Sequence, residues 1–295
     1  MKHAWTLTKI RMRLALRAPA FLFFSIIMPI AYLFFYIGVF GRGNLRAVSY
    51  MFAAVLALTV MGGFWGLSVQ LVIYREQGIL RRFRLAPVGP GAMLVSSIAS
   101  NYILTLPTIA AEFALARWFF HMEQWGNLWS TWVLVSVGIV CFATLGLIVA
   151  SVANTMQETQ VICNAIWFAL LFLSGATIPL PILPGWIQQV AVFLPATYLV
   201  TGLQRVLLRG APVWHLGPEL LALAGCAVLA FLISVQLFRW EPEAKVSRRA
   251  KAWAAATVIP FLLLGAWESA HGNIRSDARV DFQSLERRPP AENPK

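Results

Sequence analysis

The residues best suited to charge-based recognition form one run between two long apolar stretches. The run reads Tyr74-Arg75-Glu76-Gln77-Gly78-Ile79-Leu80-Arg81-Arg82-Phe83-Arg84-Leu85-Ala86-Pro87. It holds four arginines and one glutamate, in a chain of which only 12% is charged. Guanidinium and carboxylate groups form strong charged hydrogen bonds, so a partner outside a membrane could bind here. The alternative is a solvated loop whose positive charge only sets the orientation of its neighbours.

One carboxyl group stands out within the apolar stretches. Glu112 lies in the middle of the third stretch, where an ionisable group is costly and is retained for pairing or function. It could provide a polar contact in a transport cavity, a proton-linked switch or a hydrogen bond between helices. Glu112, Asn164 and Phe172 form our candidate set for a substrate pathway, although Asn164 could equally be a packing partner between helices.

The motifs of several enzyme classes are absent from the sequence. It has no Gly-x-x-x-x-Gly-Lys-Ser/Thr phosphate loop and no His-Glu-x-x-His metal motif. The four histidines are scattered, and Cys141, Cys163 and Cys226 lie in apolar stretches without metal-ligand spacing. We therefore expect no catalytic residue, metal site or cofactor in this chain.

The elements that must position these residues are membrane spans. The chain is 59% hydrophobic, and its apolar residues gather in blocks long enough to cross a hydrocarbon core of about 30 Å. Such spans must be helical, because a helix satisfies its own backbone groups. The predicted fold class is thus an all-α polytopic membrane protein. The predicted spans cover residues 20–40, 50–73, 93–119, 129–153, 161–180 and 217–238, with a weaker seventh at 252–268.

The distribution of charge predicts the orientation of the spans. The formal net charge is +12, and 14 of the 24 Lys and Arg residues lie before the first span, in the run at 74–87 or just after the sixth span. If the spans alternate, these three regions share one side. The positive-inside rule then places the N-terminus and the charged run in the cytoplasm. Nucleic-acid binding explains the positive charge less well. We expect the basic residues that flank the spans to lie against the lipid bilayer.

Three flanking segments complete the predicted organisation. Residues 1–18 fit an amphipathic helix in the cytoplasmic interface, or else an extension of the first span. The segment at 174–209 is too apolar for a loop and too rich in proline for one span, so it predicts two short helices entering the outer leaflet. The polar tail at 269–295 is expected to be disordered. It lies outside if 252–268 spans, and inside if that segment is interfacial.

At the charged run the sequence resembles the ABC-2 family of transporter permeases. Such permeases carry Arg-Glu-x-Gly-Thr-Leu, basic residues and a proline after the second span, and the run at 75–87 follows this pattern with Ile79 in place of the threonine. A second similarity covers Phe172 to Gly175, Pro179, Leu183 to Trp186 and Pro195 to Tyr198. The similarity covers about residues 5–240.

The resemblance implies a fold and a function. The chain would be a six-span transmembrane domain of an ABC exporter in the bacterial cytoplasmic (inner) membrane, moving a hydrophobic or amphiphilic substrate such as a drug-like molecule or lipid. ATP and Mg²⁺ would bind to a separate ATP-binding cassette subunit, and two permease chains, identical or different, would pair. The run at 74–87 would be the cytoplasmic coupling helix. Its expected contacts with the ATPase subunit are Arg75, Glu76, Gly78, Arg81, Arg82 and Pro87.

Two other functions remain open from the residues alone. An intramembrane lipid-modifying enzyme could use Glu112 as a catalytic carboxyl group, although no second catalytic group lies nearby in the sequence. A proton-coupled secondary transporter could use Glu112 as its proton site.

Overall fold

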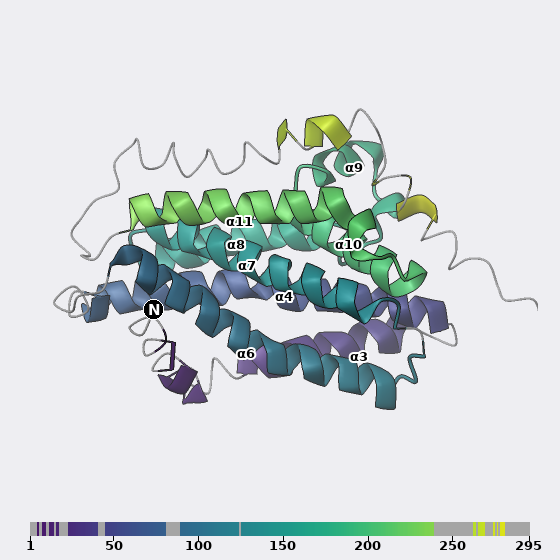
Figure 1. Cartoon of the computed structure of the whole chain (residues 1–295), viewed down its shortest axis with the longest axis horizontal. Coiled ribbons are helices and arrows are strands. Elements are labelled where there is room, and N and C mark those ends of the chain that lie inside the picture. The colour runs from purple at the N-terminus through teal and green to yellow at the C-terminus, as the bar shows by residue number, and fades with distance from the viewer. Residues whose placement is uncertain are drawn as a thin grey trace, which may run out of the picture.

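The computed structural model describes residues 23–40, 45–80, 89–123 and 125–238. It also describes residues 5, 8–9, 12–14, 16–17, 262–263, 265–268, 274, 276 and 278–280. Every regular element within this part of the chain is a helix, and the long helices lie side by side along one direction (Figure 1). The predicted all-α polytopic fold class is confirmed.

Six long helical segments correspond to the six predicted spans. They are the π-helix η1 (Phe23–Ile27) running into α3 (Met28–Phe40), α4 (Leu45–Glu76), α6 (Pro90–Trp118), α7 (Leu128–Val152), α8 (Met156–Leu173) and α11 (Gly217–Leu237). Five helices are long and apolar enough to cross a membrane, and the apolar helix at Ser25–Val39 is shorter. A bent pair of helices, Gly185–Ala191 and Pro195–Arg209, lies outside the predicted spans. Counted as one span, this pair would bring the five long helices to six candidates.

The segment between α8 and α11 is broken, as its prolines predict. It contains η2 (Leu180–Ile182), α9 (Gly185–Ala191), α10 (Pro195–Arg209) and η3 (Val213–Leu216). The axes of α9 and α10 form an angle of 95°. Arg205 of α10 donates to Glu219 of α11 at 2.5 Å, which joins the bent pair to the last long helix.

Two predicted boundaries need correction. The span expected at 161–180 is α8, which begins at Met156 because Thr155 caps its first turn, with its hydroxyl accepting from the Glu158 N–H. This helix ends at Leu173, and Gly175 follows with a left-handed φ of 87°. The span expected at 50–73 is α4, which begins at Leu45 and continues to Glu76.

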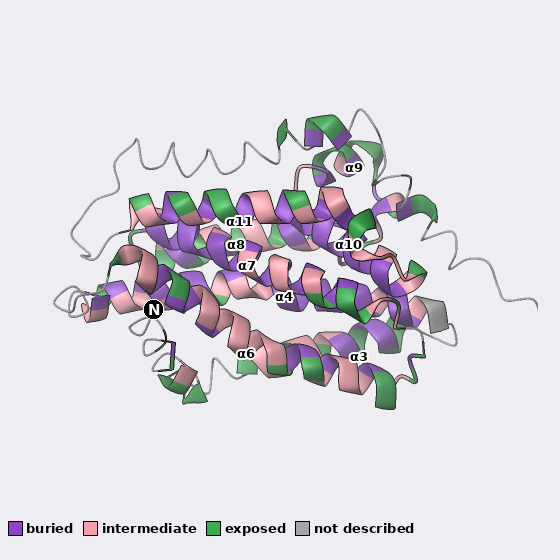
Figure 2. Ribbon diagram, viewed as in Figure 1, coloured by how far each residue is buried: buried purple, intermediate pink, exposed green. Residues whose placement is uncertain are grey.

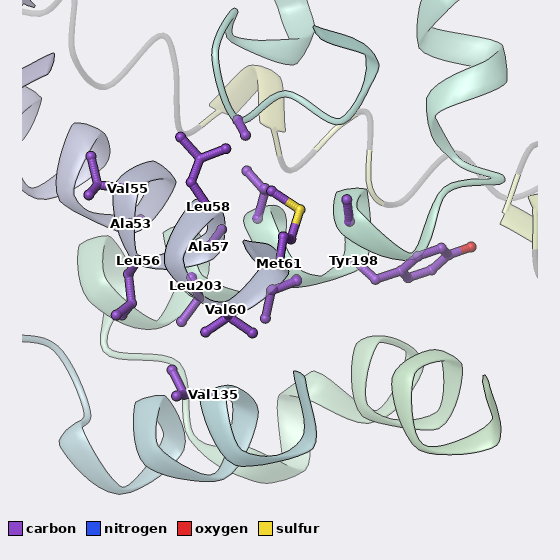
Figure 3. Close-up of a cluster of buried hydrophobic side chains, with 14 of the residues drawn as sticks. Ala53, Val55, Leu56, Ala57, Leu58, Val60, Met61, Val135, Tyr198 and Leu203 are labelled. Atoms are coloured by element: carbon purple, nitrogen blue, oxygen red, sulfur yellow. The ribbon is translucent and has the colours of Figure 1, made fainter. Parts of the chain in front are cut away.

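α4 is the centre of the bundle. It packs against α3, α6, α7, α8 and α10. Figure 3 shows apolar side chains of α4, among them Leu56 and Met61, meeting Val135 of α7 and Leu203 of α10. The exposed residues of the long helices lie on the outer faces of the bundle (Figure 2).

Small residues allow α4 and α7 to approach closely. A Cβ atom added at Gly146 of α7 would overlap the carbonyl oxygen of Phe64 on α4. The Ser68 hydroxyl of α4 lies within hydrogen-bond distance of two carbonyl oxygens, Phe64 O of its own helix and Gly146 O of α7 at 2.9 Å, which share its single proton. Lipid gives little hydrophobic driving force between spans, so close packing and interhelical hydrogen bonds must hold them together.

The bundle has two ends, which we name for use below. The Arg75 end is where α4 and α7 end and α8 begins; Leu80, Met93 at the start of α6, and Phe238 just after α11 share one apolar cluster there. The α9 end is opposite, where α8 leads into α9.

The described residues near the C-terminus lie at the α9 end. Gly265 lies against the ring of Phe193, between α9 and α10. Ile274 and Ala278 are buried in the main apolar cluster, and the Ile274 N–H donates to the carboxylate of Glu268. Residues 274, 276 and 278–280 are helical, and the other residues of the tail at 269–295, whose predicted disorder stays a prediction, lie outside the described residues. Most of the seventh stretch at 252–268 lies outside the described residues.

The close contact between α4 and α7 predicts the effect of one methyl group. We expect Gly146→Ala to lower the free energy of unfolding by about 1–3 kcal/mol, the usual cost of overpacking. Gly225→Ala on α11 is the matched control, because nothing lies within 4 Å of an added Cβ there. The measurement is the thermal unfolding midpoint of the purified protein in detergent, and equal midpoints for the two variants would contradict the packing described.

Candidate functional site

The charged run begins as the last turn of α4. The α-helix ends at Glu76, and the Gly78 N–H donates to Arg75 O at 3.0 Å. Gly78 has a φ of 68°, a left-handed conformation that glycine adopts without strain. Among the described residues, an added Cβ at Gly78 would meet nothing within 4 Å, so its φ is the observed reason for glycine in this turn. Ile79 and Leu80 after the turn are again helical, and residues 81–88 lie outside the described residues.

Arg75 points into the protein and holds the end of α7. Its side chain is buried, and its guanidinium donates to Ala150 O at 2.9 Å, Ala153 O at 2.5 Å and Asn154 O at 3.4 Å. The last carbonyl groups of a helix have no partner within the helix, and they carry the negative end of its dipole. A guanidinium group provides several donors in one plane, so it suits this position.

Glu76 holds the beginning of α8. Its Oε1 accepts from the Met156 N–H, the first of α8, at 2.8 Å. Within the turn, Glu158 Oε2 accepts from the backbone N–H of Asn154 at 2.8 Å and from its side-chain amide at 3.0 Å. Two carboxylates thus lie at the positive end of the α8 dipole, where negative charge is favoured.

The predicted coupling residues now have distinct places. Arg75 and Glu76 contact the turn between α7 and α8. Gly78 lies in the turn that ends α4. Arg81, Arg82 and Pro87 lie outside the described residues.

The candidate pathway residues lie in two places. Asn164 and Phe172 are exposed on one face of α8, which they share with Val161 and Phe168. The rings of Phe168 and Phe172 stack with centroids 6.2 Å apart. The buried side chains of this helix, including Cys163 and Leu170, face the bundle. We call the first set the α8 outer face: Val161, Asn164, Phe168 and Phe172.

Glu112 lies apart from this face, in the contact between α6 and α4. It is fully buried, and Thr59 Oγ1 of α4 donates to its Oε1 at 2.5 Å. Among the described residues, Glu112 Oε2 has no hydrogen-bond partner. The arrangement is a hydrogen bond between helices, one of the roles considered for this residue.

Comparison with known proteins then decides the family. The family model for the ABC-2 type transporter matches residues 2–208. The chain belongs to the ABC-2 type transporter family. It is an integral membrane permease, and the predicted resemblance to this family is confirmed.

Several curated ABC-2 permeases are similar to this one over much of their length. Putative transport permease YvfS of Bacillus subtilis is 23% identical over 241 residues, which are 77% of this chain and 94% of that protein. Daunorubicin resistance ABC transporter permease protein DrrB1 of Streptomyces coeruleorubidus is 24% identical over 233 residues, 75% of this chain and 80% of that protein.

A further match is partial. Linearmycin resistance permease protein LnrN of Bacillus subtilis is 26% identical over 156 residues, which are 53% of this chain. This match spans only 40% of LnrN. The ABC-2 family match itself ends at residue 208, before α11, although α11 packs against α7 and α10 in the same bundle.

The Thr59–Glu112 pair of this permease predicts a pattern of stabilities. We expect Glu112→Ala to cost about 1–3 kcal/mol, because the buried Thr59 hydroxyl loses its acceptor. Glu112→Gln should cost less, because its amide oxygen can still accept. The measurement is again the unfolding midpoint in detergent.

The apolar double variant Thr59→Val with Glu112→Leu is the control for this pair. Removing both partners leaves no unsatisfied group, so the double variant should lose less stability than Glu112→Ala. Equal stability of Glu112→Ala and the wild type would contradict a structural role for the hydrogen bond.

Proposed function

We propose that this permease is the membrane-spanning subunit of an ABC exporter driven by ATP hydrolysis in a separate ATP-binding cassette subunit. The observation that carries the proposal is the position of the charged run. It leaves the end of α4, which packs against α3, α6, α7, α8 and α10, and Arg75 and Glu76 bind α7 and α8 at the same end. A subunit that binds the run therefore acts on three helices at once. ATP and Mg²⁺ belong to that partner, in keeping with the missing phosphate loop.

The α8 outer face supports a second permease chain and an amphiphilic substrate. Asn164 is exposed within a predominantly apolar helix, and an amide facing lipid would lack partners for its hydrogen bonds. A pathway between two permease chains, identical or different, would provide water, substrate or protein partners for it. Phe168 and Phe172 offer apolar surface for a drug-like molecule or a lipid. DrrB1 and LnrN carry the names of drug-resistance permeases, which agrees with such a substrate.

The distribution of charge supports one orientation. The basic residues before the first span and in the charged run favour a cytoplasmic N-terminus and a cytoplasmic Arg75 end in a bacterial inner membrane. The ATPase subunit would then meet the Arg75 end from the cytoplasm, and the α9 end would face outward.

The central experiment is reconstitution. The wild-type permease is expected to co-purify with an ATP-binding cassette subunit of different sequence, and the complex in lipid nanodiscs should hydrolyse ATP in a vanadate-sensitive way. The permease alone in nanodiscs is the control and should not hydrolyse ATP. Lipid turnover by the purified chain alone, or uptake driven by an ion gradient without ATP, would contradict the proposal and favour the roles of Glu112 in an enzyme or a proton-coupled transporter.

The pathway assignment can be tested by thiol labelling. In a background with Cys141, Cys163 and Cys226 replaced by alanine, we expect Asn164→Cys to react with a water-soluble maleimide in the assembled complex. Leu170→Cys, on the buried side of the same helix, should react at least about tenfold more slowly, because burial limits access. Absence of labelling at Asn164→Cys in every nucleotide state would show that this face meets lipid or a dry contact.

A further inference from the structure

The two neighbouring residues Arg75 and Glu76 carry opposite charges and bind two different helix ends. Arg75 binds carbonyl groups at the end of α7, whereas Glu76 binds the first N–H of α8. Each charge matches the sign of the dipole end that it contacts. Exchanging the two residues would put a carboxylate against carbonyl oxygens and a guanidinium against an N–H donor. We call this arrangement the Arg75–Glu76 clamp.

The clamp joins a tightly packed pair of helices to a loosely packed one. α4 and α7 are locked further along by the contact at Gly146 and by the hydrogen bond from Ser68 to Gly146 O. α8 is the least buried of the long helices and packs against α4, α7 and α9. Its first turn is connected to α7 only through residues 153–155 and is held to α4 by Glu76. The position of α8 at this end therefore depends on the clamp.

The same clamp lies directly before the segment that leads away from α4. Gly78 turns the chain, and Leu80 is anchored in an apolar cluster with Leu71, Val72 and Leu147 of α4 and α7. A displacement of the chain after Gly78 would act on Arg75 and Glu76 within one helical turn. Its force would reach the carbonyl end of α7 and the N–H end of α8 through charged hydrogen bonds, which are stronger than neutral ones.

We propose that Arg75 and Glu76 are positioning residues that transmit movement of the charged run to α8, and that they do not themselves form the docking surface for the ATPase subunit. This rests on the proposed function. In this mechanism the residues after Gly78 bind the partner, and the clamp converts their displacement into a shift of α8. The α8 outer face, with Asn164 and Phe168, moves as a result.

The first experiment tests the clamp in the permease alone, without its partner. Amide hydrogen exchange is followed in the full-length protein in nanodiscs for wild type, Glu76→Ala and the charge exchange Arg75→Glu with Glu76→Arg. We expect exchange in residues 153–160 to accelerate about tenfold or more in both variants, because each loses a charged hydrogen bond to a helix end. Gln77→Ala, at the exposed neighbouring position, should leave it unchanged. Unchanged exchange in both clamp variants would overturn the clamp.

The second experiment tests transmission in the assembled complex and needs no knowledge of the substrate. Asn164→Cys reports on α8 through the change in its maleimide labelling rate between the nucleotide-free state and the state trapped with ATP and vanadate. In Glu76→Ala and Arg75→Gln we expect the ATPase subunit to bind and hydrolyse ATP as before. The ATP-dependent change in labelling should fall about tenfold. Glu76→Gln can still accept from the Met156 N–H, so this variant should keep most of the ATP-dependent change in labelling.

The outcomes separate the clamp from the proposed function. If wild-type permease binds no ATPase subunit, the proposed function fails whatever the clamp does. If it binds one that hydrolyses ATP but shows no ATP-dependent labelling change, transmission to α8 is wrong and the proposed function stands. If the wild type responds and Glu76→Ala responds equally, transmission through the clamp is wrong. Loss of ATPase binding in Glu76→Ala, with normal exchange at 153–160, would assign Glu76 to the docking surface instead. Should the charge exchange prevent folding, Glu76→Ala and Glu76→Gln still decide, because they change one exposed side chain.

Discussion

The close approach of α4 and α7 is the contact on which the rest of the bundle depends. Glycine at position 146 brings the two backbones together, and Ser68 links them with a hydrogen bond. In a membrane this packing has to replace the hydrophobic driving force that stabilises soluble bundles. The other helices pack against this pair: α3 against α4, α11 against α7, and α6, α8 and α10 against both. The pair of α4 and α7 thus forms the packed centre to which the other helices of the bundle are attached.

The membrane environment also explains why charged side chains bind the ends of neighbouring helices. Backbone groups at the ends of spans need partners, and α4 supplies them to its neighbours at the Arg75 end through Arg75 and Glu76. At the α9 end, Arg205 pairs with Glu219 and also donates to His215 O at 3.1 Å, which ties α10 to the first turn of α11. Among the described residues of the long helices, charged side chains thus lie mostly where helices begin or end. Glu112 lies instead in the middle of α6, where Thr59 satisfies one of its oxygens.

Much of the fold could be predicted from the sequence, because apolar length and charge mark membrane spans directly. α3 ends at Phe40 and α7 covers Leu128–Val152, beside predicted spans of 20–40 and 129–153, and the prolines between 179 and 195 identify the broken segment before α11. The start of α8 was missed because Gln157, Glu158 and Gln160 are polar, and apolar length cannot show a helix that Thr155 caps before them. The burial of Ile274 and Ala278 in the core could not be predicted either, because it depends on contacts distant in sequence.

The candidate site was predicted as a charged segment, but not in its geometry. Composition identifies Arg75 and Glu76 as members of one charged run, yet it cannot tell which charged side chain turns inward. That depends on α7 ending beside α4, a contact between residues about 75 positions apart. Once this contact exists, the buried guanidinium must face the carbonyl groups, because a buried charge without partners would be far more costly. A segment that looks uniform in sequence thus contains, before Gly78, two charged residues that bind the ends of neighbouring helices.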